Sequence, residues 1–300
     1  MVLKKPLTFE EQVLKLEEHG MNISDREIAT NILKRINYYK LTGYALQFRM
    51  EEDTFFYKPE TDFMNVYKIY CFNEKMRGIL RDYLEKLELY YRTQISYGFS
   101  ILKCNEEPHN QHYDSDSFYD KNNYTKVMEN FKREQNYYKD SNIVKHHKEK
   151  YNDEMPLWVA VELMSFSTLS KLYGCMYNKE ADLIATNVNS TQNILRNRLK
   201  CFSILRNKCA HGSRLYNTVL NPPIKLSPFF LRKYSDVIND TLYAYIVAIV
   251  KSLPNKDDRI EFVSRIKDVI ENYKNEINLK LIGFPENYDE ILLESIWNYF

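Results

Sequence analysis

The chain has 300 residues, a net charge of +1, and 44% hydrophobic and 28% charged residues. This length supports a buried core without disulfides or metal, and the five cysteines form no CxxC pair, which argues against a zinc ribbon or a disulfide framework. Only seven glycines are present, so few of the tight turns that many short strands need are available. The composition therefore favours a helical protein in a reducing compartment.

The N-terminus and the most apolar run exclude two other classes of protein. Residues 1–20 mix charges through what would be the apolar core of a signal peptide. The run LYAYIVAIV at 242–250 is far shorter than the roughly 20 residues of a membrane span. We therefore expect a cytoplasmic protein that makes no membrane contact.

Residues 1–60 are expected to form a small N-terminal region of two short helices and a hairpin. Thr8 with Glu11, and Ser24 with Glu27, have capping-box spacing, so a helix is expected to begin directly after each hydroxyl residue. Residues 44–59 carry two aromatic runs around an acidic turn, which predicts the hairpin. A DNA-binding helix-turn-helix is an alternative, although Ile, Leu and Tyr at helical spacing in the second helix favour packing.

Residues 61–300 are expected to form one all-α domain. From Phe63 to Lys103, apolar residues recur at intervals of three and four, which predicts a long core helix. Residues 104–153 lack a sustained apolar stripe and are interpreted as a polar insertion or a loosely packed arm. Further helices are predicted over 156–177, 190–211, 230–252, 256–276 and 287–299.

The charge pattern contains one unusual segment. From Leu183 to Ser235 there is no Asp or Glu, although 41 acids in 300 residues would place roughly seven there. Such a cationic segment suits a polyanion, most simply the backbone of RNA or DNA; alternatively, acids from elsewhere, such as 104–153, pair with its bases. The bases are Arg196, Arg198, Lys200, Arg206, Lys208, Arg214, Lys225, Arg232 and Lys233.

Within this segment, ILRNKCAHGSRLYN at 204–217 ends an apolar helix with polar groups. Gly212 suits the left-handed turn that ends a helix, which places His211 in the last turn. Asn207 is four residues from His211 and shares its face, whereas Arg206 lies about 140° around the helix from His211. A single straight helix does not direct Arg206 and His211 at one atom unless its end unwinds or a second copy contributes, so a composite site is expected.

These side chains suit RNA cleavage, which needs a base, an acid and a cation for the charged transition state. A histidine can exchange protons near neutral pH, and an arginine stays charged and binds phosphate through two bonds. The same spacing also occurs in helix ends that are merely capped and solvated. The spacing alone leaves both interpretations open.

The stretch RNKCAHGSRLYN resembles the signature of HEPN proteins, in which an Arg and a His separated by four to six residues form the site of metal-independent ribonucleases. The chain is also similar along nearly its whole length to the Abi family of bacterial abortive-infection proteins, the AbiD and AbiF group. The resemblance implies an all-α HEPN-like helical bundle, a homodimer in which both motifs face one cleft, and an RNA-acting toxin in phage defence that uses no cofactor. The similar segments are TFEEQVLKLEEHG, INYYKLTGYALQF, VYKIYCFNEKMRGILRDYLEKLELYYRTQISY, PLWVAVELMSFSTLSKLY, LRNKCAHGSRLYN and IGFPENY.

The resemblance also implies roles for individual residues. Arg206 would hold the phosphate, His211 would transfer the proton, and Asn207 would orient one of them. Glu88 and Arg92, four apart on the long helix, could support the site; the alternative is an ion pair on the helix surface. RNA is the expected substrate, a partner noncoding RNA is a further expectation, and a noncatalytic RNA-binding protein is the alternative function. The bases expected to bind RNA are Lys208, Arg214, Arg196 and Lys200.

Overall fold

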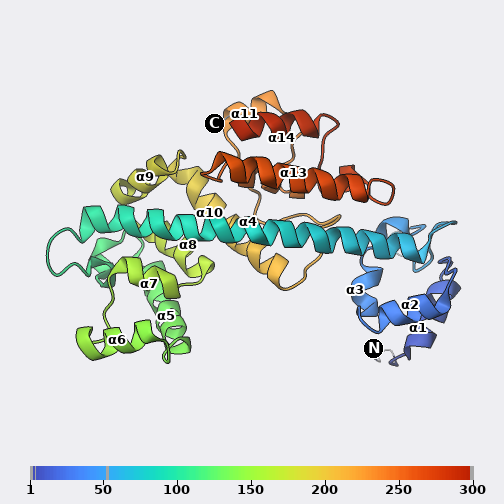
Figure 1. The fold of residues 1–300 in the computed structure, drawn as a ribbon, viewed down its shortest axis with the longest axis horizontal. Helices are drawn as coiled ribbons and strands as arrows, with labels where there is room; N and C mark the ends of the chain where they lie inside the picture. Colours follow the sequence, from blue (N-terminus) through green and yellow to red (C-terminus); the bar gives the residue numbers. More distant parts are fainter. Residues whose placement is uncertain (1–2, 4, 52–53, 298–300) are drawn as a thin grey trace.

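The computed structural model describes residues 3, 5–51 and 54–297 (Figure 1). These residues form fourteen α-helices, four short 3-10 helices and no β-strand, which confirms the predicted all-α class. The α-helices are α1 (Phe9–Glu18), α2 (Arg26–Leu33), α3 (Tyr38–Thr42), α4 (Phe63–Lys103), α5 (Lys121–Tyr137), α6 (Asn142–Tyr151), α7 (Leu157–Leu163), α8 (Phe166–Cys175), α9 (Asn178–Asn187), α10 (Gln192–Ala210), α11 (Pro228–Lys233), α12 (Leu242–Val250), α13 (Lys256–Asn272) and α14 (Tyr288–Trp297). The 3-10 helices are Leu46–Phe48, Gln111–Tyr113, Ser115–Ser117 and Leu279–Ile282.

Helix α4 has the predicted bounds and runs through the middle of the molecule (Figure 1). It packs against α7, α9, α10 and α13, while α3 contacts it near its N-terminal end. Apolar side chains at intervals of three and four, such as Leu80, Leu84, Leu87 and Tyr91, are buried against these neighbours. The helix therefore carries a large part of the core and positions elements that are distant in sequence.

The N-terminal helices begin largely as their caps predict. At the start of α1, the Glu11 amide donates to the Thr8 hydroxyl at 3.1 Å and the Thr8 amide donates to the Glu11 carboxylate at 2.7 Å, which confirms the capping box. The predicted cap at Ser24 is wrong, because the carboxylate of Asp25 accepts from the Ile28 amide at 2.9 Å and starts α2 one residue later.

Among the described residues, the predicted hairpin at 44–59 is reduced to a short antiparallel pairing without a named strand, and a 3-10 helix precedes it. A bridge joins Arg49 to Tyr57, the Lys58 amide donates to the Phe48 carbonyl at 2.7 Å, and the Met50 amide donates to the Phe56 carbonyl at 3.0 Å. The Tyr57 amide donates to the carbonyl of His19 at 2.8 Å, so this part of the chain is also bound to the end of α1. The predicted acidic turn includes 52–53, which lie outside the described residues.

Residues 104–153 are better packed than the sequence suggests. Helix α5 buries Tyr124, Val127 and Phe131, which are three and four residues apart, and packs along α8. The interpretation as a loosely packed arm is therefore wrong for α5. Three apolar positions, separated by Lys, Asn and Glu, were too sparse a stripe to be recognised in the sequence.

Two predicted helices are each divided, and one helix was not predicted. The stretch at 156–177 breaks into α7 and α8, because the Ser165 hydroxyl accepts from the Thr168 amide at 3.2 Å and starts a new helix. The stretch at 230–252 divides into α11 and α12, and α9 was not expected.

All nine residues of α12 are buried, so this most apolar run packs inside the protein. Nowhere in the described chain is a helix both long and apolar enough to span a membrane.

Candidate functional site

Helix α10 positions the polar motif at its C-terminal end. It begins with the Thr191 hydroxyl as cap, and its apolar side chains, among them Leu199 and Phe202, pack between α4 and α8. His211 caps the other end, with its amide donating to the Asn207 carbonyl at 2.9 Å, and Gly212 follows with a φ of +66°. The predicted left-handed glycine that ends the helix is confirmed.

Three polar side chains of this helix end face solvent. Arg206, Asn207 and His211 are all exposed, and an Arg206 guanidinium N–H donates to the Asn207 side-chain oxygen at 3.4 Å. In the described part of the chain, the His211 ring forms no hydrogen bond or ion pair. The helix end therefore presents a guanidinium, an amide and an imidazole that retain unused hydrogen-bonding capacity.

A buried carboxylate forms an ion pair with Arg206. Glu88 Oε2 lies 3.6 Å from Arg206 Nε, while its other oxygen, Oε1, accepts from Arg92 Nη2 at 2.6 Å. Arg92 also donates to the backbone carbonyl of Val161 at the C-terminal end of α7. Glu88 and Arg92 are buried, so the alternative of an ion pair on the helix surface is wrong. Glu88 thus contacts Arg206 from the buried side, while 44% of the Arg206 side chain stays exposed.

Arg206 and Asn207 open into a pocket of about 390 Å³, called here the Arg206 pocket. Its charged side chains come from four helices and comprise three guanidinium and three carboxylate groups. His211 does not line it, as the angular separation of Arg206 and His211 on the helix predicts. The charged lining residues are Glu88, Arg92, Arg133, Glu134, Glu162 and Arg206.

The loop after the helix end is bound to α4. The Asn73 side-chain oxygen accepts from the backbone amides of Leu215 and Tyr216 at 2.8 and 2.9 Å. Arg77, one turn further along α4, donates to the Ser213 carbonyl at 3.3 Å. Asn73 and Arg77 are buried, so the second half of the motif is an anchored part of the fold.

The predicted RNA-binding bases differ in their exposure and in their contacts within the fold. Arg196 and Lys200 are exposed on α10, and Lys208 is half-buried. Arg214 donates to the backbone carbonyl of Gly43 after α3, which uses part of its hydrogen-bonding capacity within the fold. The structure therefore leaves Arg196 and Lys200 the most accessible to a ligand.

Other bases of the acid-free segment have internal partners. Arg198 is buried and donates to the Ser252 hydroxyl at 3.2 Å, and Lys233 lies 2.5 Å from Glu294. Among the residues that the structure describes, no ion pair joins a base of this segment to an acid of 104–153. The alternative that acids from elsewhere pair with bases of this segment therefore holds for Arg206, which pairs with Glu88, and for Lys233, which pairs with Glu294.

Cys209, within the motif, is a core residue. Burial raises the pKa of its thiol to about 12, although Arg77 and Arg81 act in the opposite direction. The thiol is therefore protonated near neutral pH and packs as an apolar group. In the described ranges, no three His, Cys, Asp or Glu side chains are grouped as metal ligands.

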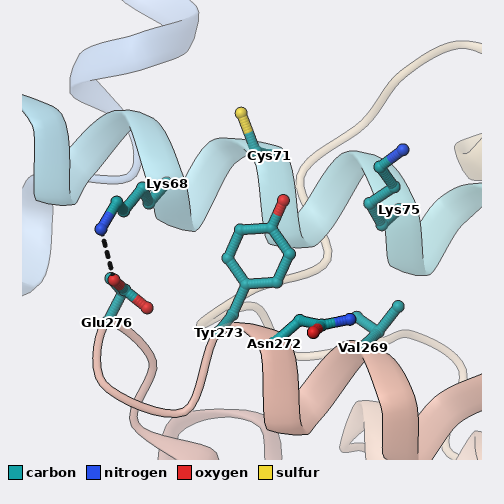
Figure 2. A pocket seen from close by; sticks show the side chains of 7 residues that line it. All are labelled: Lys68, Cys71, Lys75, Val269, Asn272, Tyr273 and Glu276. Atoms are coloured by element: carbon teal, nitrogen blue, oxygen red, sulfur yellow. Dashed lines mark hydrogen bonds and ion pairs between the residues drawn. The ribbon is translucent and has the colours of Figure 1, made fainter.

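A second pocket, of about 570 Å³, lies between α4 and α13 (Figure 2). Lys68 and Glu276 pair across its mouth at 2.7 Å, and Tyr273 rises from the end of α13 toward Cys71. None of the predicted site residues lines it. Its one lining carboxylate is already paired, so we do not assign it a role.

The fold and site describe an all-α protein with a solvent-facing Arg, Asn and His at the end of a core helix. Comparison with protein families matches residues 31–217 to the family described as Abi-like protein. This span is more than half of the chain and includes α4 and the motif, so the chain belongs to the Abi-like protein family. Membership supports a role in abortive-infection defence. Neither a curated protein nor a solved structure was found to match the chain.

Proposed function

We propose that the protein is an endoribonuclease of abortive-infection defence that cleaves RNA without a metal ion. The observation that carries the proposal is the exposed helix end, where buried Glu88 contacts Arg206 and where Asn207 and His211 project one turn apart. A guanidinium, a proton-transfer group and an open pocket are the parts that phosphodiester cleavage by an internal hydroxyl requires.

The proposed reaction forms one P–O bond and breaks another. The 2′-hydroxyl oxygen of the substrate attacks the adjacent phosphorus, and the 5′-oxygen of the next nucleotide leaves with the electron pair of the broken bond. The His211 imidazole accepts the 2′-hydroxyl proton and the resulting imidazolium donates a proton to the leaving oxygen, giving a 2′,3′-cyclic phosphate and a 5′-hydroxyl. Arg206 stabilises the charge that develops on the phosphate oxygens.

Two copies of the chain are proposed to build this site. Arg206 reaches into its pocket while His211, on another face of the helix, lies outside it. Pairing Arg206 of one copy with His211 of a second would place both groups on one phosphate. This is why the proposal specifies a homodimer.

Cleavage of single-stranded RNA in EDTA tests the proposal. His211→Ala and Arg206→Ala should each lower the cleavage rate roughly 10²–10⁴-fold while leaving thermal unfolding unchanged, because both side chains are exposed. His146→Ala, which removes an exposed histidine of α6, is the control and should keep full activity. Cleavage that survives His211→Ala would remove His211 from the mechanism.

Mixing the two inactive variants tests the composite site. If the site combines Arg206 of one copy with His211 of another, an exchanged mixture of Arg206→Ala and His211→Ala contains dimers with one intact pair and should regain cleavage. A mixture as inactive as its components would show that each chain uses its own Arg and His.

A noncatalytic RNA-binding protein acting with a partner noncoding RNA is the second candidate. The exposed Arg196 and Lys200 on α10 favour it, because bases alone bind phosphate without cleaving it. This candidate predicts salt-sensitive binding of RNA that stays intact over hours, weakened by Arg206→Ala. RNA recovered intact with the wild-type protein, combined with no cleavage in EDTA, would favour this second candidate.

A further inference from the structure

A pocket of about 420 Å³ lies where α5, α8 and α10 meet, beside the Arg206 pocket; we call it the α5/α8/α10 groove. Four cationic side chains line it: Lys126 from α5, Lys171 from α8, and Arg196 and Lys200 from α10. All four are exposed. The sequence directed attention to the two from α10, whereas the fold adds the two lysines from other helices.

The cations of the groove are available to a ligand. Within the described residues, none of the four forms an ion pair, and the only lining carboxylate is Asp120. Hydrogen bonds from the Asn123 amide and side chain lower the pKa of Asp120, and the charges of Lys126 and Arg196 act in the same direction. Asp120 therefore stays ionised and occupied as the cap of α5, which leaves the groove with an excess of positive charge.

The lining favours a phosphate backbone over a stacked base. Ser170 and Ser203 are buried at the groove, and at Gly174 no atom would meet an added side chain, so the wall is open there. Among the lining residues that the structure describes, none carries an aromatic ring. Recognition of an unstacked base commonly uses an aromatic platform, whereas lysines, arginine and hydroxyls suit phosphate and ribose oxygens.

The groove continues into the Arg206 pocket along one face of α10. Arg196, Lys200, Ser203 and Asn207 follow one another at intervals of four, three and four residues, so they share a face. Lys200 precedes Asn207 by seven residues, about 10 Å along the helix. Ser167 at the start of α8 lines both pockets and joins them.

We propose that the α5/α8/α10 groove binds the sugar–phosphate backbone of single-stranded RNA next to the Arg206 pocket. Its volume of about 420 Å³ is in the range of a small-ligand site, which suits a short stretch of one strand. Because it lacks aromatic rings, the groove should hold RNA with little preference for base identity. The inference rests on the proposed function only in taking RNA as the ligand, since binding here requires no catalysis.

The inference can be tested with a labelled single-stranded RNA and protein that carries His211→Ala. Fluorescence anisotropy measures the binding over a range of salt concentrations. Adding Lys171→Ala and Lys200→Ala should weaken binding about tenfold or more at low salt. The slope of log Kd against log salt should fall by about 1.4, as expected for the loss of two phosphate contacts. The matched control adds Lys34→Ala and Lys179→Ala, which remove the same charge from exposed positions directly after α2 and on α9.

The outcomes separate this inference from the proposed function. If the wild type binds RNA through the groove and does not cleave it, the inference stands and the endoribonuclease fails. If the wild type cleaves while the groove variant binds like its control, the endoribonuclease stands and the inference is wrong. Equal affinity for duplex RNA, or no salt-dependent binding at all, would also overturn the inference.

Discussion

The two halves of the motif at 204–217 differ in what their polar groups contact. Arg206, Asn207 and His211 face solvent at the helix end, and only Arg206 reaches the interior, through Glu88. The loop from 212 to 217 is bound by Asn73 and Arg77 of α4 and by the carbonyl of Gly43. One short sequence signature therefore combines groups available for chemistry with groups needed for folding.

The two arginines of the motif show that the same residue type can serve either chemistry or folding. Arg206 and Arg214 are eight residues apart and look equivalent in the sequence as candidate phosphate ligands. In the fold, Arg206 opens into a pocket, whereas Arg214 donates to a backbone carbonyl. Substitutions should accordingly separate loss of activity from loss of stability.

The largest loss of stability is expected for Asn73→Ala. This change leaves the buried amides of Leu215 and Tyr216 without an acceptor, which should lower the free energy of unfolding by roughly 2–6 kcal/mol. Urea unfolding followed by circular dichroism measures the change. Asn73→Asp keeps an acceptor oxygen and should lose less; equal stability of Asn73→Ala and wild type would show that the loop is not held as described.

A loss of similar size, with a lower upper limit, is expected for Glu88→Ala, where the exposed half of the motif meets the interior. Removing the carboxylate leaves the buried Arg92 charge unpaired and frees Arg206, so the unfolding free energy should fall by about 3–5 kcal/mol and RNA cleavage should weaken in the remaining folded protein. Chemical denaturation and cleavage assays report the two effects.

The control for Glu88→Ala is Glu18→Ala, which removes the exposed partner of Lys15 and should change stability little. Full cleavage activity in folded Glu88→Ala protein would show that Arg206 needs no orientation by the carboxylate.

The smallest effect is expected for Arg214→Ala, the matched partner of Arg206→Ala. Loss of the donor to Gly43 should lower the unfolding free energy by about 1.5 kcal/mol, because the side chain is only half-buried. Activity per folded molecule should be retained, in contrast to Arg206→Ala. Thermal melts and cleavage rates of the two variants, measured side by side, test this expectation. A stable but inactive Arg214→Ala variant would instead show that Arg214 contacts the RNA.

Much of the fold could be predicted from periodicity and caps. The helical spacing of apolar residues predicts the long helix α4, and the capping box at Thr8 predicts the start of α1. The errors came from competition between neighbours. Asp25 competes with Ser24 for the same cap, and Ser165 ends one helix and starts another inside an apolar run. Local patterns do not show which of two adjacent caps wins.

The candidate site was only partly predictable. The position of Arg206, Asn207 and His211 at a helix end follows from the apolar stripe and Gly212. The contact of Glu88 with Arg206 does not, because four-residue spacing within α4 says nothing about which helix packs beside it. The contribution of α5 and α8 to the groove depends on tertiary packing in the same way, and the assignments of RNA-binding residues stay predictions.

The two anchors of the motif, Asn73 and Glu88, lie on the same helix, fifteen residues apart. On an ideal helix this separation is about 22 Å along the axis and about 60° around it, so both point to nearly the same side of α4. The pitch of α4 thus fixes the spacing between the loop that Asn73 binds and the Arg206 guanidinium that Glu88 contacts. A one-residue insertion between the anchors would turn one relative to the other by about 100°, and α10 could then engage only one of them.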